Sequence, residues 1–247
     1  MKRAFNIAAL AMFSVLASGC DSLPGKPGPE SLIPRPDSIL DAATLYKENC
    51  AGCHGQNGRG AVAPPIGLPE YQALADEATQ LNIVTNGVPH TAMPGFSHKA
   101  GGFLTDQQIE ALVKGMRATW LKQNVAAGQA PPYTDSTSGD SSAGASVYEA
   151  SCSNCHGKAG GPTGPSGSVL NTSYLALVSP QALRTAVIVG RPDLNMPGWR
   201  TVNASHSLSE KEIRDVVAFL LSHRSATPGQ PYSTKSAAAA GNNGATP

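Results

Sequence analysis

Residues Cys50–Gly55 read CAGCHG, and residues Cys152–Gly157 read CSNCHG. The segment ATLY at 43–46 precedes the first copy, and the similar segment ASVY at 145–148 precedes the second. Downstream, a Met-Pro-Gly motif follows each copy, and the offset between the copies changes only from 102 to 104 residues. Two copies indicate duplication of one domain, because a solenoid needs at least about three stacked repeats.

The repeated Cys-x-x-Cys-His pattern is the attachment signature of c-type haem. Residues i and i+3 lie on one side of a helical turn, so two thiols can bond both vinyl groups of one porphyrin while the histidine ligates iron. A thioredoxin-like pair or half of a zinc site would not require the histidine, and two disulfides are the remaining alternative. The predicted attachment and iron-binding residues are Cys50, Cys53 and His54 in the first copy and Cys152, Cys155 and His156 in the second.

A methionine in each copy is the predicted second axial ligand. Met93 and Met196 occupy matched Met-Pro-Gly loops, in which Pro fixes φ and Gly tolerates unusual backbone conformations. Met116 lies on an apolar helical stripe and is predicted to be core. The rival ligands are His90, His98 and His206.

Further roles are predicted around the two motifs. The N–H of each motif histidine needs an acceptor, which we expect from a carbonyl at Pro64–Pro65 in the first copy and at Pro162–Pro165 in the second. Tyr46 and Tyr148 are expected to bridge the first helix of each copy to the last. Arg191 either pairs with a haem propionate or lies at the surface.

Histidine and methionine ligation has a functional consequence. The soft thioether favours ferrous iron and raises the reduction potential. Six-coordinate iron also leaves no place for a substrate. The ligand set therefore predicts electron transfer, and the sequence predicts an electron-transfer protein rather than an enzyme.

The secondary structure is predicted to be helical. Thr105 with Gln108, and Ser209 with Glu212, form capping boxes that start the closing helix of each copy. The apolar stripes of these helices predict core residues Ile109, Leu112, Val113, Met116, Ile213, Val216, Val217 and Leu220. Shorter helices are predicted at Leu45–Asn49, Ala78–Val84 and Gln181–Val189, and the Gly- and Pro-rich segments after each CxxCH are predicted to be loops.

The N-terminus is typical of an exported chain. Lys2 and Arg3 precede the apolar run Ile7–Ala17, which is too short to span a bilayer. The sequence LASGC at 16–20 resembles the lipobox of bacterial lipoproteins, although Ala17 stands where leucine is usual. We therefore expect lipidation at Cys20, the one cysteine outside the two motifs. Cleavage after Gly19 that leaves a free thiol is the alternative.

Composition shifts predict the organisation of the chain. The predicted segments are a signal peptide at 1–19, a Pro/Gly-rich tether at 20–40, domains at 41–123 and 144–224, a linker at 124–143, and a disordered tail at 225–247. The formal net charge of +1 shows no excess of Lys and Arg, so no nucleic-acid partner is expected.

Each copy resembles a class I cytochrome c domain, over about residues 42–122 and 144–223. The shared pattern is a helix, CxxCHG, a Gly/Pro-rich stretch, a Gly-x-Pro then Met-Pro-Gly loop, and a closing helix. The resemblance implies an all-α fold of two tandem domains, each a few helices around one covalent haem c. His90 and the lack of an Arg after Gly87 depart from the pattern and put the equality of the two potentials in doubt.

Two such domains on one lipid-anchored chain resemble the dihaem cytochromes of bacterial respiratory chains. The resemblance implies a chain on the periplasmic face of a bacterial membrane. Its partners would be redox proteins such as a membrane respiratory complex, an oxidase or a reductase. A dihaem peroxidase is one alternative and would need an iron with a labile ligand, and a gas-binding sensor is another.

Overall fold

The computed structural model describes residues 25, 28, 33–60, 63–89, 91–121 and 130–227. The predicted signal peptide, Cys20, His90 and most of the predicted tail lie outside these residues. Residues 1–39 form one unit and residues 40–247 form another, and the helices from α2 onward all lie in the second.

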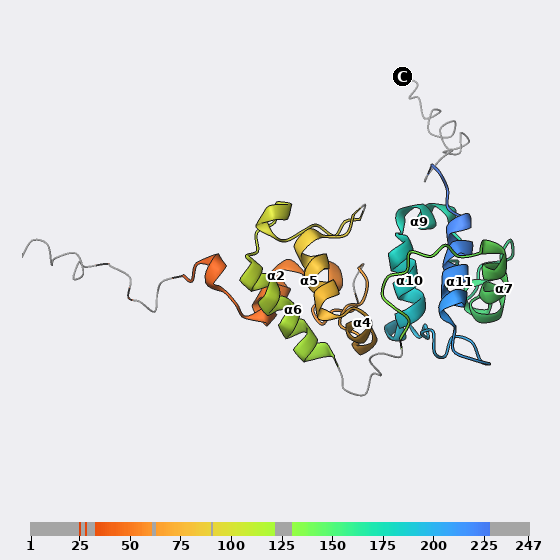
Figure 1. Cartoon of the computed structure of the whole chain (residues 1–247), viewed down its shortest axis with the longest axis horizontal. Helices are drawn as coiled ribbons and strands as arrows, with labels where there is room; N and C mark the ends of the chain where they lie inside the picture. Colours follow the sequence, from red (N-terminus) through yellow and green to blue (C-terminus); the bar gives the residue numbers. More distant parts are fainter. Residues whose placement is uncertain are drawn as a thin grey trace, which may run out of the picture. The chain divides into compact units, whose positions relative to one another are not determined.

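Every regular element among the described residues is helical. The first repeat contains α2 (Ala42–Asn49), α3 (Ala51–His54), α4 (Pro69–Leu74), α5 (Glu77–Asn86) and α6 (Asp106–Trp120). The second contains α7 (Ser141–Ser151), α8 (Ser153–His156), α9 (Thr172–Leu177), α10 (Pro180–Val189) and α11 (Glu210–Ser222). Three short 3-10 helices, Pro36–Ser38, His98–Ala100 and Pro192–Leu194, complete the set. The all-α prediction is confirmed, and Figure 1 shows the corresponding helices of each repeat.

Both closing helices begin where the sequence predicts. Thr105 accepts the backbone N–H of Gln108, and the Gln108 side chain accepts the backbone N–H of Thr105. Ser209 and Glu212 form the same reciprocal pair at the start of α11. The eight predicted core residues of these two helices are all buried, and each is at most 9% exposed.

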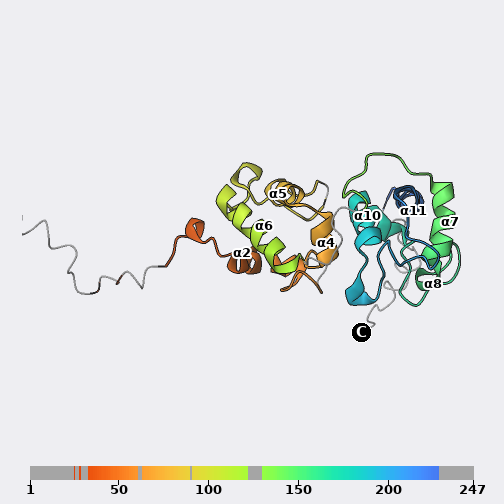
Figure 2. The same cartoon turned by 60° about the horizontal axis from the view of Figure 1, so that its bottom comes forward.

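The first helix of each repeat packs on the closing helix, α2 on α6 and α7 on α11. Glycines allow this close approach. A Cβ atom on Gly144 would lie 1.9 Å from the carbonyl oxygen of Asp215, and one on Gly115 would lie 2.1 Å from the Cβ of Ala42. Figure 2 shows α7 and α11 of the second repeat from a second direction.

Residues 130–140, which fall in the predicted linker, are attached to the second repeat. The buried Arg184 of α10 donates to the carbonyl oxygens of Pro132 and Tyr133 and to Glu210 at 2.7 Å. Asp135 accepts from Arg214 at 3.1 Å. These contacts fix the chain just before α7 begins.

Protonation of Asp215 on α11 is expected to weaken the second repeat. Its carboxylate accepts from Lys211 at 2.6 Å and from the backbone N–H of Asp140 at 2.9 Å. Burial acts to raise the pKa of Asp215, but Lys211, the Asp140 N–H and Arg214 outweigh it, so the pKa is lowered from its ordinary value. Asp215 therefore stabilises the fold at pH values above the aspartate pKa of the unfolded chain, which is about 3.9. This stabilisation is lost as the pH falls through the lower pKa that Asp215 has in the folded protein.

We therefore expect Asp215→Asn to lower the melting temperature at neutral pH, with a difference from wild type that shrinks below about pH 4. Thermal unfolding of both proteins from pH 7 to pH 3 measures this. Glu149→Gln is the control, because Glu149 and Lys158 form an exposed pair of a kind worth about 0–1 kcal/mol. A difference for Asp215→Asn that does not depend on pH would contradict the prediction.

None of the helices in the described part of the chain combines the length and apolar character needed to cross a membrane.

Candidate haem-attachment sites

Each CxxCH motif forms a single helical turn. In the first repeat the backbone N–H groups of Cys53 and His54 both donate to the carbonyl oxygen of Cys50. The glycine that follows ends the turn with a positive φ, 79° at Gly55 and 88° at Gly157. At Gly55 a Cβ atom would lie 1.9 Å from the Arg59 carbonyl oxygen, so the position needs glycine.

The same backbone pattern recurs in the second repeat, where Cys155 and His156 donate to the Cys152 carbonyl. One turn therefore brings two thiols and an imidazole together in each repeat.

A tyrosine holds each turn against the closing helix. The Tyr46 hydroxyl donates to the carbonyl of Gly55 at 2.7 Å, and the Tyr148 hydroxyl donates to that of Gly157 at 2.8 Å. The Tyr46 ring lies 5.0 Å from that of Trp120 on α6, and the Tyr148 ring lies 5.2 Å from that of Phe219 on α11. The prediction that these tyrosines bridge the first helix to the last is confirmed.

Both histidines are oriented through one ring nitrogen. His54 Nδ1 lies 2.9 Å from the carbonyl oxygen of Pro64, as the sequence predicts. His156 Nδ1 lies 2.9 Å from the carbonyl oxygen of Gly167. The sequence-based expectation of an acceptor at Pro162–Pro165 is therefore wrong. A carbonyl acceptor fixes the Nδ1–H tautomer and leaves Nε2 to ligate a metal.

The four motif cysteines are free thiols. Burial, followed by the neighbouring Cys53, raises the pKa of the Cys50 thiol to about 12. Burial and Cys155 raise that of Cys152 to about 11. These raised pKa values keep the Cys50 and Cys152 thiols protonated at neutral pH. Among the described residues, no three His, Cys, Asp or Glu side chains gather in a way that could hold a metal ion.

The two methionine loops share one backbone design. The Val88 N–H donates to the Met93 carbonyl at 3.0 Å, and the Arg191 N–H donates to the Met196 carbonyl at 2.9 Å. A glycine with positive φ precedes each loop, Gly87 in the first repeat and Gly190 in the second. A Cβ atom on Gly190 would lie 2.6 Å from the Met196 carbonyl oxygen. The repeats therefore place their methionines in equivalent, tightly folded loops.

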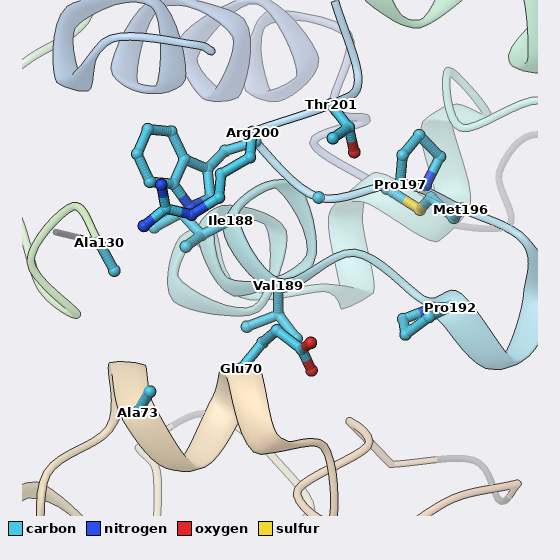
Figure 3. Close-up of a pocket in the computed structure, with 12 residues that line it drawn as sticks. Glu70, Ala73, Ala130, Ile188, Val189, Pro192, Met196, Pro197, Arg200 and Thr201 are labelled. Carbon is cyan, nitrogen blue, oxygen red and sulfur yellow. The ribbon is translucent and has the colours of Figure 1, made fainter. Parts of the chain in front are cut away.

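The Met196 loop borders a hollow of about 290 Å³. Figure 3 shows Ile188 and Val189 extending toward it from α10, with Met196 and Pro197 on the adjacent loop. The rest of its lining comes from Glu70, Ala73, Ala130, Pro192, Gly198, Trp199, Arg200 and Thr201. Met196 thus lies beside a mostly apolar space.

The rival residues have other partners. His98 Nε2 lies 3.1 Å from the carbonyl oxygen of Phe103, and His206 lies 2.7 Å from Glu212.

Met116 is 6% exposed and belongs to the core, as predicted. Arg191, a candidate for pairing with a propionate, forms an ion pair with Asp193 at 2.9 Å.

These residues fit a covalently attached haem. Each repeat provides two free thiols, a histidine fixed through Nδ1 and a methionine in an ordered loop. The predicted ligands stay predictions, namely Cys50, Cys53, His54 and Met93 for one haem and Cys152, Cys155, His156 and Met196 for the other.

Sequence reasoning missed the arginines that hold the short helices. Arg117 of α6 donates to the carbonyls of Gln72 and Ala75 at the end of α4. Arg224 does the same for Leu175 and Val178 around α9. A basic residue near the end of each closing helix was the available signal.

The family described as cytochrome c oxidase, cbb3-type, subunit III matches residues 37–114 and 139–220. The chain is similar to the cbb3-type cytochrome c oxidase subunit CcoP of Azospirillum brasilense, at 36% identity over 76 residues, 28% of this chain and 24% of that protein. It is also similar to the dihydro-haem d1 dehydrogenase of Pseudomonas aeruginosa, at 30% identity over 95 residues, 36% of this chain and 18% of that protein. The matches thus span about a quarter or less of these curated relatives.

Among solved structures, a chain of the Kuenenia stuttgartiensis reducing HAO-like protein complex Kustc0457/Kustc0458 aligns with a TM-score of 0.45 and 16% identity. The alignment covers 78% of this chain and all of that one.

Proposed function

Because the chain belongs to the family of cytochrome c oxidase, cbb3-type, subunit III, we propose that it is a membrane-anchored dihaem cytochrome c that passes single electrons between respiratory partners outside the cytoplasm. Membership of the family supports electron transfer by a cytochrome c with covalently bound haem c. We add to this that the chain carries two haems, a lipid anchor and respiratory redox partners. The chain would act as a free carrier or as the cytochrome subunit of a larger complex.

The observation that carries the proposal is that each repeat contains the same set of predicted ligands in the same local geometry. Each repeat has the CxxCH turn, a histidine fixed through Nδ1 by a backbone carbonyl, and a methionine in a loop of the same backbone design. A haem bound there supplies a centre that gains and loses one electron. A carrier needs that centre to change little between oxidation states.

The residues of each repeat are suited to this task. Thioether bonds from the paired cysteines would keep the cofactor attached during exchange with partners. The carbonyls of Pro64 and Gly167 hold the imidazoles in one tautomer and orientation. Met93 and Met196 would each provide a second protein ligand to an iron, which would leave no place there for water or a substrate.

Spectroscopy of the purified full chain tests the proposal. We expect a sharp c-type alpha band in the reduced protein, about two haems per chain, and reversible one-electron titration of each. Rapid peroxide turnover, or carbon monoxide binding without denaturant, would favour the peroxidase or the gas sensor instead. A colourless protein matured in a competent host would overturn the proposal.

The anchor is tested at Cys20. This cysteine lies three residues after the end of the apolar run, ahead of the first domain, and stable anchoring by acyl chains requires more than one chain. We expect Cys20→Ser to move the cytochrome from the membrane fraction to the soluble periplasmic fraction, with its haem content unchanged. Membrane retention of Cys20→Ser, measured by fractionation and haem staining, would refute lipid anchoring.

A further inference from the structure

We propose that the first repeat holds its haem iron at a higher reduction potential than the second repeat does. The inference rests on the proposed function, because it requires one haem in each repeat. If this order holds, electron transfer between the two haems has a preferred direction. Electrons that enter the cytochrome would settle on the first repeat, and the second repeat would be the stronger donor.

The histidine side of the site is more deeply buried in the first repeat. His54 is 9% exposed, whereas His156 is only partly buried. In both repeats the loop after the motif returns to the turn, since the Ala63 N–H donates to the Cys53 carbonyl and the Ser166 N–H donates to that of Cys155. The first loop has a further closing bond, from the Gly67 N–H to the Gly58 carbonyl. In the corresponding loop of the second repeat, nearly every residue from 158 to 168 is exposed.

Matched positions beyond the two acceptors differ in burial in the same direction. The acceptors Pro64 and Gly167 are 103 residues apart, so Pro65 corresponds to Ser168 and Leu68 corresponds to Asn171. Pro65 is buried and Leu68 is 2% exposed, whereas Ser168 and Asn171 are both exposed. Buried apolar residues thus follow the acceptor of the first histidine, whereas exposed polar residues follow the acceptor of the second.

Burial acts on the potential through charge. The ferric form carries one more positive charge than the ferrous form, and a medium of low dielectric constant disfavours the more highly charged state. Solvent exposure and burial are among the determinants of haem potentials. The covered site in the first repeat should therefore favour the reduced iron more strongly.

A nearby cation acts in the same direction. Arg59 lies five residues after His54, and its guanidinium donates to the Gly67 carbonyl at 2.7 Å. Among the described carboxylates, Asp193 feels the charge of Arg59, which helps to lower its pKa, but the ion pair of Asp193 is with Arg191 at 2.9 Å. Residues 159–168 of the second repeat contain no charged residue, and the cation just before them, Lys158, is paired with Glu149 at 2.7 Å.

The total charge of the two domains points the other way but should matter less. Residues 41–123 carry a formal charge of −1, and residues 144–224 carry +2. Exposed charges are screened beyond about 8 Å at physiological ionic strength. Five of the second repeat's seven cations are also paired with carboxylates, namely Lys158, Arg184, Arg191, Lys211 and Arg214. The local environment of each histidine should therefore decide the order.

A redox titration of the haem-loaded full chain tests the order. Histidine in place of the axial methionine should lower the potential of the altered haem alone, because it removes the thioether that raises it. We expect two waves in wild type, separated by at least tenfold in their one-electron equilibrium constants, which is about 59 mV. Met93→His should shift the upper wave and Met196→His the lower one.

Arg59 gives a second, independent test. Arg59→Gln should lower the upper wave and leave the lower wave in place, and Arg59→Lys, which keeps the charge, should restore most of the shift. Lys158→Gln is the matched control, because it removes one positive charge from the loop of the second repeat, and it should leave the upper wave in place.

The outcomes separate the inference from the function on which it rests. A single unresolved wave, or an upper wave that moves in Met196→His, overturns the order while leaving the dihaem carrier intact. One haem per chain, or no reversible titration, instead overturns the proposed function.

Discussion

Replacing Met196 by alanine is expected to lower the potential of the haem in the second repeat and to open its iron to carbon monoxide. The thioether stabilises ferrous iron, and the truncated side chain cannot reach the metal. The loop itself should persist, because it is closed by backbone bonds, namely those from Arg191 N–H to the Met196 carbonyl and from Trp199 N–H to the Ile188 carbonyl. Redox titration and carbon monoxide difference spectra measure the two effects.

Met116→Ala is the matched control for Met196→Ala. Met116 is 6% exposed in the core of the first repeat and has no ligand role in the proposal. Its loss should reduce the free energy of unfolding by about 2–5 kcal/mol and leave both potentials unchanged. Met196→Ala should instead lower the potential of the second haem and change the free energy of unfolding less than Met116→Ala does. If Met196→Ala alters neither potential nor carbon monoxide binding, Met196 is not an axial ligand.

Features encoded by nearby residues were predictable from the sequence. The capping boxes at Thr105 and Ser209 depend on residues three positions apart, and both form as predicted. The closing helices have apolar stripes long enough to fix their buried faces. The Tyr46 and Tyr148 bridges were predictable because the repeat placed both tyrosines at the same distance from CxxCH.

Features that depend on distant contacts or small loop changes were not predictable. α4 and α9 span six residues each, too short for a clear apolar period. The acceptor for His156 is Gly167 because the second loop is one residue longer before it. The attachment of residues 130–140 depends on Arg184, which is buried only because Pro132, Tyr133 and Glu210 satisfy its guanidinium.

The ligand assignments follow from spacing and the repeat, and the geometry is compatible with them. The structure adds what spacing cannot supply, which is the environment of each site. The motifs of the two repeats are almost the same, yet Leu68 and Asn171 differ in exposure at one matched position. Identical ligands in different surroundings are how one duplicated domain can come to hold two potentials.

Changing Cys152 and Cys155 together to serine is expected to halve the covalent haem content of the chain. Serine cannot form the thioether bonds, and the first repeat keeps its own pair at Cys50 and Cys53. Because an apolar cofactor contributes to the core of so small a domain, the second repeat should also become sensitive to proteolysis. The first repeat should retain its alpha band and its potential.

Haem staining after denaturing electrophoresis and the mass of the intact chain measure this result. The mirror variant, with serine at Cys50 and Cys53, should lose the other half, and Cys20→Ser should lose none. The Cys152/Cys155 variant also removes the lower wave of the redox titration if the first repeat has the higher potential. Full covalent haem content in this variant would show that the second motif does not attach haem, and the dihaem proposal would then be wrong.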